Sequence, residues 1–141
     1  MISFDNALAV AENKRSNWGV PESMKSRFKV DIADLKDKTI EIESICVVSK
    51  KAKDKTGLEI VNKKGENVYN HITFIAFGGD KYTVTKSALM AIQLDEIEPC
   101  MKETETETYI PGLEGAKVKV GFKSVQYADK KMYDQPYLAD A

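Results

Sequence analysis

Residues that form disulfides and metal sites are scarce in this chain of 141 residues. It holds two cysteines, Cys46 and Cys100, and one histidine, His71. Two distant cysteines form no disulfide framework, and with a single histidine they have no metal-ligand spacing. Cys46 lies in an apolar strand pattern, where a free thiol is usually buried. We therefore expect no metal site.

Catalytic signatures are missing as well. The sequence has no glycine-rich phosphate loop of the P-loop or dinucleotide type, no G-x-S-x-G motif, and no recognisable pairing of a nucleophile with the histidine. Carboxylates are abundant, but the sequence alone does not pair them. We expect a protein that is not an enzyme and that uses no cofactor.

Long hydrophobic runs are absent. None approaches the roughly 18 apolar residues of a membrane span. The partly apolar N-terminal stretch is interrupted by Asp5, and no basic region precedes it as in a signal peptide. We expect one soluble, cytoplasmic domain with no membrane partner.

Arginine is rare, since Arg15 and Arg27 are the only two, and the formal net charge is -1. Lysine therefore supplies most of the positive charge. Lysine suits a solvated, sequence-indifferent contact with phosphate, whereas arginine is preferred for bidentate reading of a base. Because the net charge is small, the distribution of charge has to indicate any polyanionic partner.

A short helix is expected over Asn6–Lys14. It is weakly amphipathic and marginal alone, so it needs a partner, either its own domain or a second copy of the chain. The second case predicts a homo-oligomer assembled through Leu8, Val10 and Trp18.

The stretch Lys38–Lys50 predicts one long, bent strand. Ile40 and Ile42 alternate with glutamates, and the phase then slips to Ile45 and Val47. A β-bulge produces such a slip, and two separate strands are the alternative. The polar residues that follow, 50–70, form a long basic excursion without an internal repeat, and such loops are often functional or disordered.

Two runs rich in β-branched and aromatic residues flank a Gly-Gly-Asp turn in His71–Thr85, which predicts a hairpin. A two-residue turn places Ile75 and Tyr82 on the interior face and Phe74 with Lys81 on a wet face. A three-residue turn reverses this pairing, and both remain open.

The rest of the chain predicts one helix and a second hairpin. Ser87 is a suitable N-cap for a helix over Ala88–Glu96. An acidic, threonine-rich stretch follows over 101–114. Ala116–Tyr127 alternates lysines with apolar residues, and Met132–Leu138 forms the last strand.

A bent strand, a hairpin, a helix and a second hairpin follow in the order of an OB-fold. This is a five-stranded Greek-key barrel with a short helix between strands three and four. We expect a mainly β protein with an N-terminal helical or extended arm over 1–27 and the OB-fold domain over 28–141. A β-rich α+β sandwich is the alternative.

Three stretches carry a resemblance: FKVDIADLKDKTIEIESICVV, HITFIAFGGDKYTVTKSALMAI and KVKVGFKSVQYADKKMYDQPYL. The chain resembles the small OB-fold single-stranded-DNA-binding proteins of phages and of conjugative plasmids of Gram-positive bacteria. The resemblance implies sequence-independent coating of DNA during replication or conjugative transfer. The chain departs from housekeeping bacterial single-strand binders, because it has no glycine-rich linker with an acidic tip, so recruitment of repair enzymes by a tail is not expected.

Binding of single strands needs cations along the phosphates and rings that stack on bases. The predicted nucleic-acid-binding residues are Lys50, Lys51, Lys53, Lys55, Tyr69, Phe74, Lys81, Tyr82, Lys117, Lys119, Lys123, Tyr127, Lys130, Lys131 and Tyr133. The partner is single-stranded DNA, with double-stranded DNA or RNA as further possibilities. A protein-interaction module of a phage or conjugation assembly, and an RNA-binding OB-fold, are the alternative functions.

Overall fold

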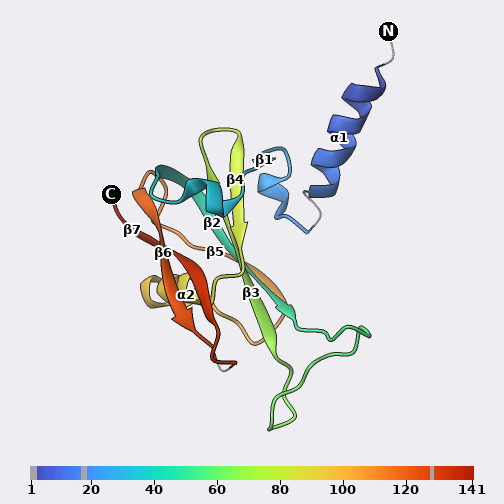
Figure 1. The fold of residues 1–141 in the computed structure, drawn as a ribbon, viewed down its shortest axis with the longest axis vertical. Coiled ribbons are helices and arrows are strands. Elements are labelled where there is room, and N and C mark those ends of the chain that lie inside the picture. The colour runs from blue at the N-terminus through green and yellow to red at the C-terminus, as the bar shows by residue number, and fades with distance from the viewer. Residues whose placement is uncertain (1–2, 17–18, 128) are drawn as a thin grey trace.

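The fold is organised around one long strand, β2 (Thr39–Lys51), in a computed structural model that describes residues 3–16, 19–127 and 129–141. The antiparallel strand β3 (Tyr69–Phe77) pairs along one edge of β2. On the other edge, β6 (Lys117–Gln126) pairs with the start of β2, and β5 (Thr106–Tyr109) pairs further along. Because β2 serves different neighbours at its two ends, the sheet curls strongly around it (Figure 1).

A β-bulge at Glu43 bends β2 where the sequence pattern changes phase. Ile42 lies opposite Phe77 and Ser44 lies opposite Ala76, so Glu43 is the extra residue. The isoleucines on both sides of the bulge consequently point into the same core. The prediction of a bulge in this strand is confirmed.

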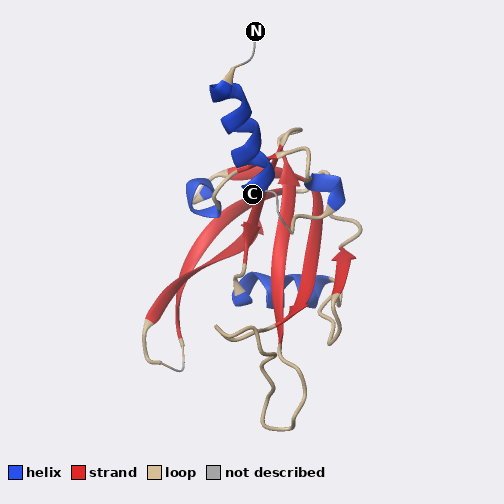
Figure 2. Cartoon of the chain, turned by 90° about the vertical axis from the view of Figure 1, so that its right-hand side faces the viewer, coloured by secondary structure: helices blue, strands red, loops and turns tan. Residues whose placement is uncertain are grey.

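The remaining elements complete a mainly β fold. In chain order they are α1 (Phe4–Ser16), the 3-10 helix η1 (Glu22–Met24), β1 (Phe28–Lys29), η2 (Ile32–Leu35), β2, β3, β4 (Lys81–Thr85), α2 (Ala88–Ile97), β5, β6 and β7 (Met132–Asp140). The strand order is β1-β4-β3-β2-β6-β7, with β5 also on β2. Figure 2 shows a curled half-barrel with α2 lying across the strands near one end. The prediction of five strands is not confirmed, because the described residues form seven.

The turn between β3 and β4 contains three residues. Phe77 lies opposite Lys81 and Ala76 lies opposite Tyr82. Gly78 and Gly79 in the turn have positive φ, which glycine adopts without strain. The pairing that assumes a two-residue turn is therefore wrong, and Tyr82 lies on the outer face of the sheet.

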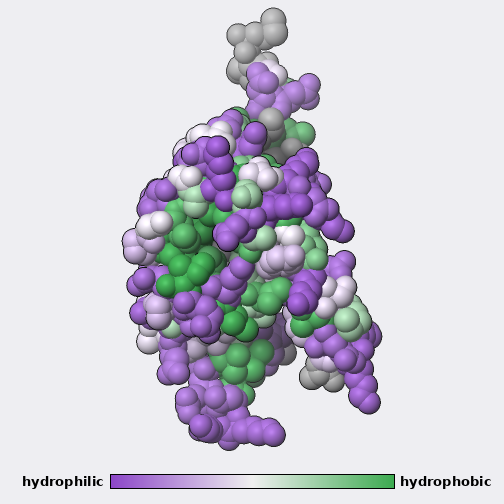
Figure 3. All heavy atoms as spheres, turned by 90° about the vertical axis from the view of Figure 1, so that its left-hand side faces the viewer, coloured by the Kyte–Doolittle hydropathy of each residue, from purple (hydrophilic) through white to green (hydrophobic). Residues whose placement is uncertain are grey.

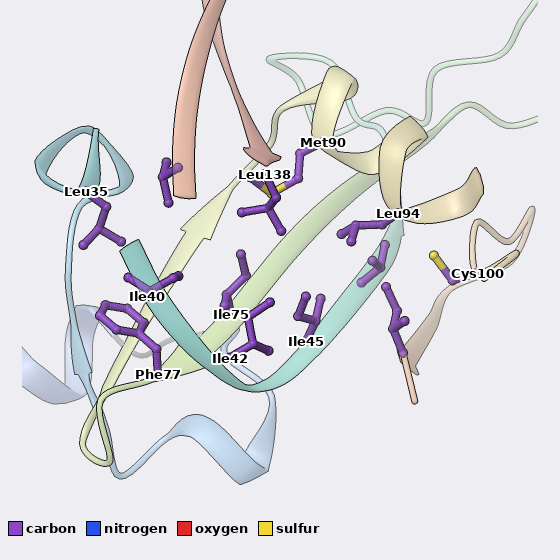
Figure 4. Close-up of a cluster of buried hydrophobic side chains, with 13 residues drawn as sticks. Leu35, Ile40, Ile42, Ile45, Ile75, Phe77, Met90, Leu94, Cys100 and Leu138 are labelled. Carbon is purple, nitrogen blue, oxygen red and sulfur yellow. The ribbon is translucent and has the colours of Figure 1, made fainter. Parts of the chain in front are cut away.

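The main core lies inside the curl and is closed by α2. The Ser87 hydroxyl accepts a hydrogen bond from the Met90 amide, so the predicted N-cap is confirmed. The cluster, shown in Figure 4, consists of Leu35, Ile40, Ile42, Ile45, Val47, Ile75, Phe77, Met90, Leu94, Cys100, Ile110, Val120 and Leu138. Burying one such large side chain contributes roughly 1.5–3 kcal/mol, which makes this cluster the main source of stability.

The outer edge of β7 is bound by α2. The Gln93 side chain donates to the Leu138 carbonyl at 2.5 Å and accepts from the Leu138 amide at 2.9 Å. The Ser87 hydroxyl donates to the Pro136 carbonyl at 2.7 Å. These bonds satisfy backbone groups that a neighbouring strand would otherwise bind. Helix side chains thus close the curl between β4 and β7, which do not pair in the described sheet.

The segment before β1 packs on the outer face of β3 and β4. Val20 and Met24 are buried there in one cluster with Phe74 and Tyr82. β1 pairs parallel with β4 and holds the segment in place. The predicted boundary at residue 27 therefore falls inside a packed layer, and of the residues before β1 only α1 extends away from the body (Figure 1).

Residues 52–68 contain two turns of the same kind, and the second begins eight residues after the first. We call this segment the double turn. In each turn a side-chain oxygen accepts from the amides two and four residues on. These are Asp54 from Thr56 and Leu58, and Asn62 from Lys64 and Glu66. Ala52, Ile60 and Val68 are also spaced eight residues apart, and their backbone hydrogen bonds form a ring. The Ile60 amide donates to the Ala52 carbonyl, the Val68 amide to the Ile60 carbonyl, and the Ala52 amide to the Val68 carbonyl. The expectation of no internal repeat concerns the amino-acid sequence, whereas this repeat lies in the hydrogen-bond pattern.

Candidate nucleic-acid interface

One face of the hairpin formed by β6 and β7 carries three lysines. Lys117, Lys119 and Lys123 are exposed on β6. The apolar residues that alternate with the first two lysines pack in or against the main core. The predicted division of this strand into an apolar face and a lysine face is confirmed.

Two tyrosines of β7 share that face. Gly121 lies opposite Tyr137, and Val125 lies opposite Tyr133. Residues opposite each other in a ladder point to the same side, and alternate residues of a strand do so too. We call this surface the β6–β7 face; it comprises Lys117, Lys119, Lys123, Tyr133 and Tyr137, with Tyr127, Lys130 and Lys131 at the tip.

Tyr137 lies directly on Gly121. A Cβ atom added to Gly121 would come 2.6 Å from Cζ and 2.8 Å from Cε1 of the Tyr137 ring. Any side chain at position 121 would therefore displace the ring. Tyr137 is absent from the site residues predicted from sequence, and the signal that identifies it is its four-residue spacing from Tyr133 within one strand.

The tip of the hairpin brings two rings together. The ring centroids of Tyr127 and Tyr133 are 4.9 Å apart, at an interplanar angle of 37°. The Tyr133 hydroxyl donates to Asp129 Oδ2 at 2.8 Å, and this bond raises the pKa of Tyr133. Lys130 and Lys131 are exposed beside these rings. The tip thus combines stackable rings with cations.

Positive charge is concentrated in two parts of the chain. Residues 117–131 contain five lysines and one carboxylate, and residues 50–66 contain six lysines and three carboxylates. The rest of the chain has ten basic and eighteen acidic residues. Figures 1 and 2 show the double turn and the tip of the β6–β7 hairpin projecting from the end of the body opposite α1. The molecule is therefore polarised, although its net charge is only -1.

The lysines differ in how far their charge is compensated. Lys51 Nζ lies 3.5 Å from Glu59 Oε1. Lys50, Lys53 and Lys55 are exposed near it. No lysine of the β6–β7 face takes part in an ion pair within the described residues. The β6–β7 face is thus the less compensated of the two lysine clusters.

Eight predicted site residues lie apart from this face: the four lysines at positions 50, 51, 53 and 55, and Tyr69, Phe74, Lys81 and Tyr82. Phe74 and Tyr82 are only 6% and 0% exposed, because Val20 and Met24 cover them. Their prediction as stacking rings is corrected accordingly. Tyr69 is half-buried in β3, and Lys81 is exposed beside the β3–β4 turn, two strands from β2.

The N-terminal helix leaves its predicted oligomerisation residues uncovered. Leu8 is 57% exposed and Val10 is 54% exposed, and Phe4 is exposed as well. Trp18 lies outside the described residues. The helix is therefore available to a partner, since its own domain does not cover these side chains.

A large cavity lies at the end of the half-barrel near the β3–β4 turn. It has a volume of about 980 Å³, and Ile40, Ile42 and Phe77 are among its lining residues. Asp34, Glu41, Glu43 and Glu114 also line it, with only two lysines. These carboxylates repel phosphate, so this cavity is not part of the candidate interface.

The single histidine contacts a serine of the neighbouring strand. His71 Nδ1 lies 2.8 Å from the buried Ser49 hydroxyl, and burial lowers the pKa of His71. Within the described residues, no three His, Cys, Asp or Glu side chains gather where they could hold a metal ion. No helix in the described part combines the length and apolar character needed to cross a membrane.

The family resemblance stays a prediction. No protein-family model, curated protein or solved structure matches the chain.

Proposed function

We propose that this protein binds single-stranded DNA without sequence preference and coats it during replication or conjugative transfer of phage or plasmid DNA. The β6–β7 face is the proposed contact surface. The observation that carries the proposal is the combination of unpaired lysines on β6 with tyrosines on β7 on one side of one hairpin. Lysines bind the phosphates and tyrosines stack on the bases, and neither contact requires a particular sequence.

The fold supports the proposal as well. We propose that β2, β3, β4, α2, β6 and β7 correspond to the five strands and helix of an OB-fold, with β1 and β5 as additions. The pairing of β2 with both β3 and β6 supports this assignment. In OB-folds the loops after the first and fourth strands flank the ligand. Here these loops are the double turn and the hairpin tip, which are the two basic segments.

The test is fluorescence anisotropy with labelled oligo-dT at several salt concentrations. Each phosphate contact contributes about 0.7 to the slope of log affinity against log salt for single strands. The variant K119E/K123E reverses the charge at two lysine positions. It should lower the affinity for oligo-dT and reduce that slope by about 1.4. Absence of wild-type binding at low salt would end the proposal.

A matched control separates specific contacts from a general effect of charge. The variant K29E/K81E makes the same change in net charge on β1 and β4, at the opposite end of the strand order. We expect it to bind nearly as tightly as the wild type. An equal loss in both variants would assign binding to diffuse charge. Competition with RNA oligomers tests the RNA alternative, because the 2′-hydroxyl distinguishes the two polymers.

Self-association through α1 is a second, separable proposal. The exposure of Phe4, Leu8 and Val10 on a 13-residue helix supports it, since so short a helix is marginal without a partner. Deleting residues 1–18 should then reduce both oligomer mass in sedimentation and cooperativity on long DNA. Unchanged values in both measurements would remove this proposal and leave DNA binding in place.

A further inference from the structure

A hollow lies between α2 and the β6–β7 face. Leu89 and Gln93 of α2 line it, together with Lys123 and Tyr137 of the hairpin. Its volume is about 290 Å³. A water molecule takes roughly 30 Å³ of liquid, so the hollow has room for about ten non-hydrogen atoms, which is the size of one nucleobase. Figure 3, which faces the side where α2 lies, shows hydrophobic patches within a largely hydrophilic surface.

The walls of this hollow suit a flat, apolar ring. Tyr137 lies against Gly121 and borders the hollow, and Leu89 is a half-buried aliphatic wall on α2. A base is well accommodated by such walls, because stacking and apolar contact need only a π-face. Lys123 adds the cation that the adjoining phosphate requires.

The side-chain amide that lines the hollow is held by β7. Gln93 donates to the carbonyl and accepts from the amide of Leu138, which fixes its orientation and leaves one N–H and one oxygen lone pair. The walls that a base would stack on or pack against, Tyr137 and Leu89, do not distinguish one base from another.

We propose that the hollow holds one nucleobase of a bound single strand between Tyr137 and Leu89, with Lys123 on the neighbouring phosphate. This inference rests on the proposed function and names the base-contact part of the same site. Stacking on Tyr137 and apolar contact with Leu89 need only a π-face, so we expect oligomers of different base composition to bind with similar affinity.

The first test fills the hollow. In the variant Leu89→Trp the indole occupies the space of the base, and affinity for oligo-dT should fall about 5- to 150-fold, the range that one stacked base contributes. The salt slope should not change, because no charge is altered. Ile92→Trp is the matched control: Ile92 lies on the same helix, is 54% exposed and does not line the hollow. We expect wild-type affinity for it.

The second test changes the probe. The probe is an oligomer of the same length in which abasic sites replace the bases, so the number of phosphates is preserved. The wild type should bind it more weakly than oligo-dT, and Leu89→Trp should show a smaller difference between the two. If thermal unfolding shows that Leu89→Trp does not fold, the wild-type comparison still refutes the base site when the two oligomers bind equally.

The outcomes separate the two levels of the proposal. If Leu89→Trp binds oligo-dT as tightly as the wild type, or if the wild type binds the abasic oligomer as tightly as oligo-dT, the base site is refuted while DNA binding stands. If the wild type binds no oligomer at low salt, the proposed function fails, and the base site fails with it.

Discussion

Arg27 forms an ion pair with Glu43, in which Nη2 and Oε2 are 2.5 Å apart. Glu43 is the bulge residue of β2, and its other carboxylate oxygen accepts a hydrogen bond from the Gly79 amide in the β3–β4 turn. The Arg27 guanidinium also donates to the carbonyls of Lys81 and Phe77, at 3.4 and 3.5 Å. One carboxylate therefore connects the bulge, the turn and the segment that precedes β1.

Replacing Glu43 by Gln should lower stability in a pH-dependent way. Hydrogen bonds from Arg27 and then from the Gly79 amide hold the pKa of Glu43 below its ordinary value of 4.5. The stabilisation is therefore complete above pH 4.5 and is lost as pH falls through the lowered pKa. Because the pair is partly exposed, we expect a loss of about 1 kcal/mol or less at pH 7, and the loss should shrink steadily as the pH is lowered below 4.5. Urea unfolding over a series of pH values measures it, and a loss that does not change with pH would contradict the assignment.

Deleting residues 1–27 should damage the fold, whereas deleting residues 1–18 should not. The longer deletion removes Val20 and Met24 and uncovers Phe74 and Tyr82, which form one buried cluster. Exposing such a contiguous apolar face favours aggregation. Thermal unfolding and light scattering compare the two deletions. Equal behaviour of the two would show that the segment contributes no packing.

Gly121→Val should be destabilising, although valine is a better strand former than glycine. The new side chain collides with the Tyr137 ring, and overpacking of this kind costs about 1–3 kcal/mol. Thermal unfolding measures the loss. In the double variant Gly121→Val with Tyr137→Ala, the two losses should not add, since each removes the same contact. If the two losses of stability add strictly, the proposed contact between position 121 and the Tyr137 ring is contradicted.

Both thiols should resist alkylation in the folded protein. Burial raises the pKa of Cys46 to about 12 and also raises the pKa of Cys100, so both remain protonated near pH 8. Iodoacetamide followed by mass spectrometry should detect no labelling in buffer and two labels in denaturant.

Local features of the fold follow from the sequence because they depend on neighbouring residues. The phase slip after Ile42 marks the bulge, Ser87 marks the start of α2, and alternation marks the lysine face of β6. Each of these patterns is set by backbone geometry within one strand or one helical turn.

Long-range relationships were decided by the tertiary structure. One additional residue in the β3–β4 turn places Tyr82 on the outer face, since a shift of one residue exchanges the two faces of a strand. The burial of Phe74 and Tyr82 then depends on Val20 and Met24, fifty or more residues away in the chain.

The candidate site divides in the same way. Its lysines and tyrosines are visible in the sequence as alternate residues of two strands. Which of them share a surface depends on the register of β6 against β7, and the hollow beside Tyr137 depends on how α2 binds the β7 edge. Composition and periodicity determined the strands and their faces, whereas packing between distant segments determined which faces stay open to a ligand, because only folding brings those segments into contact.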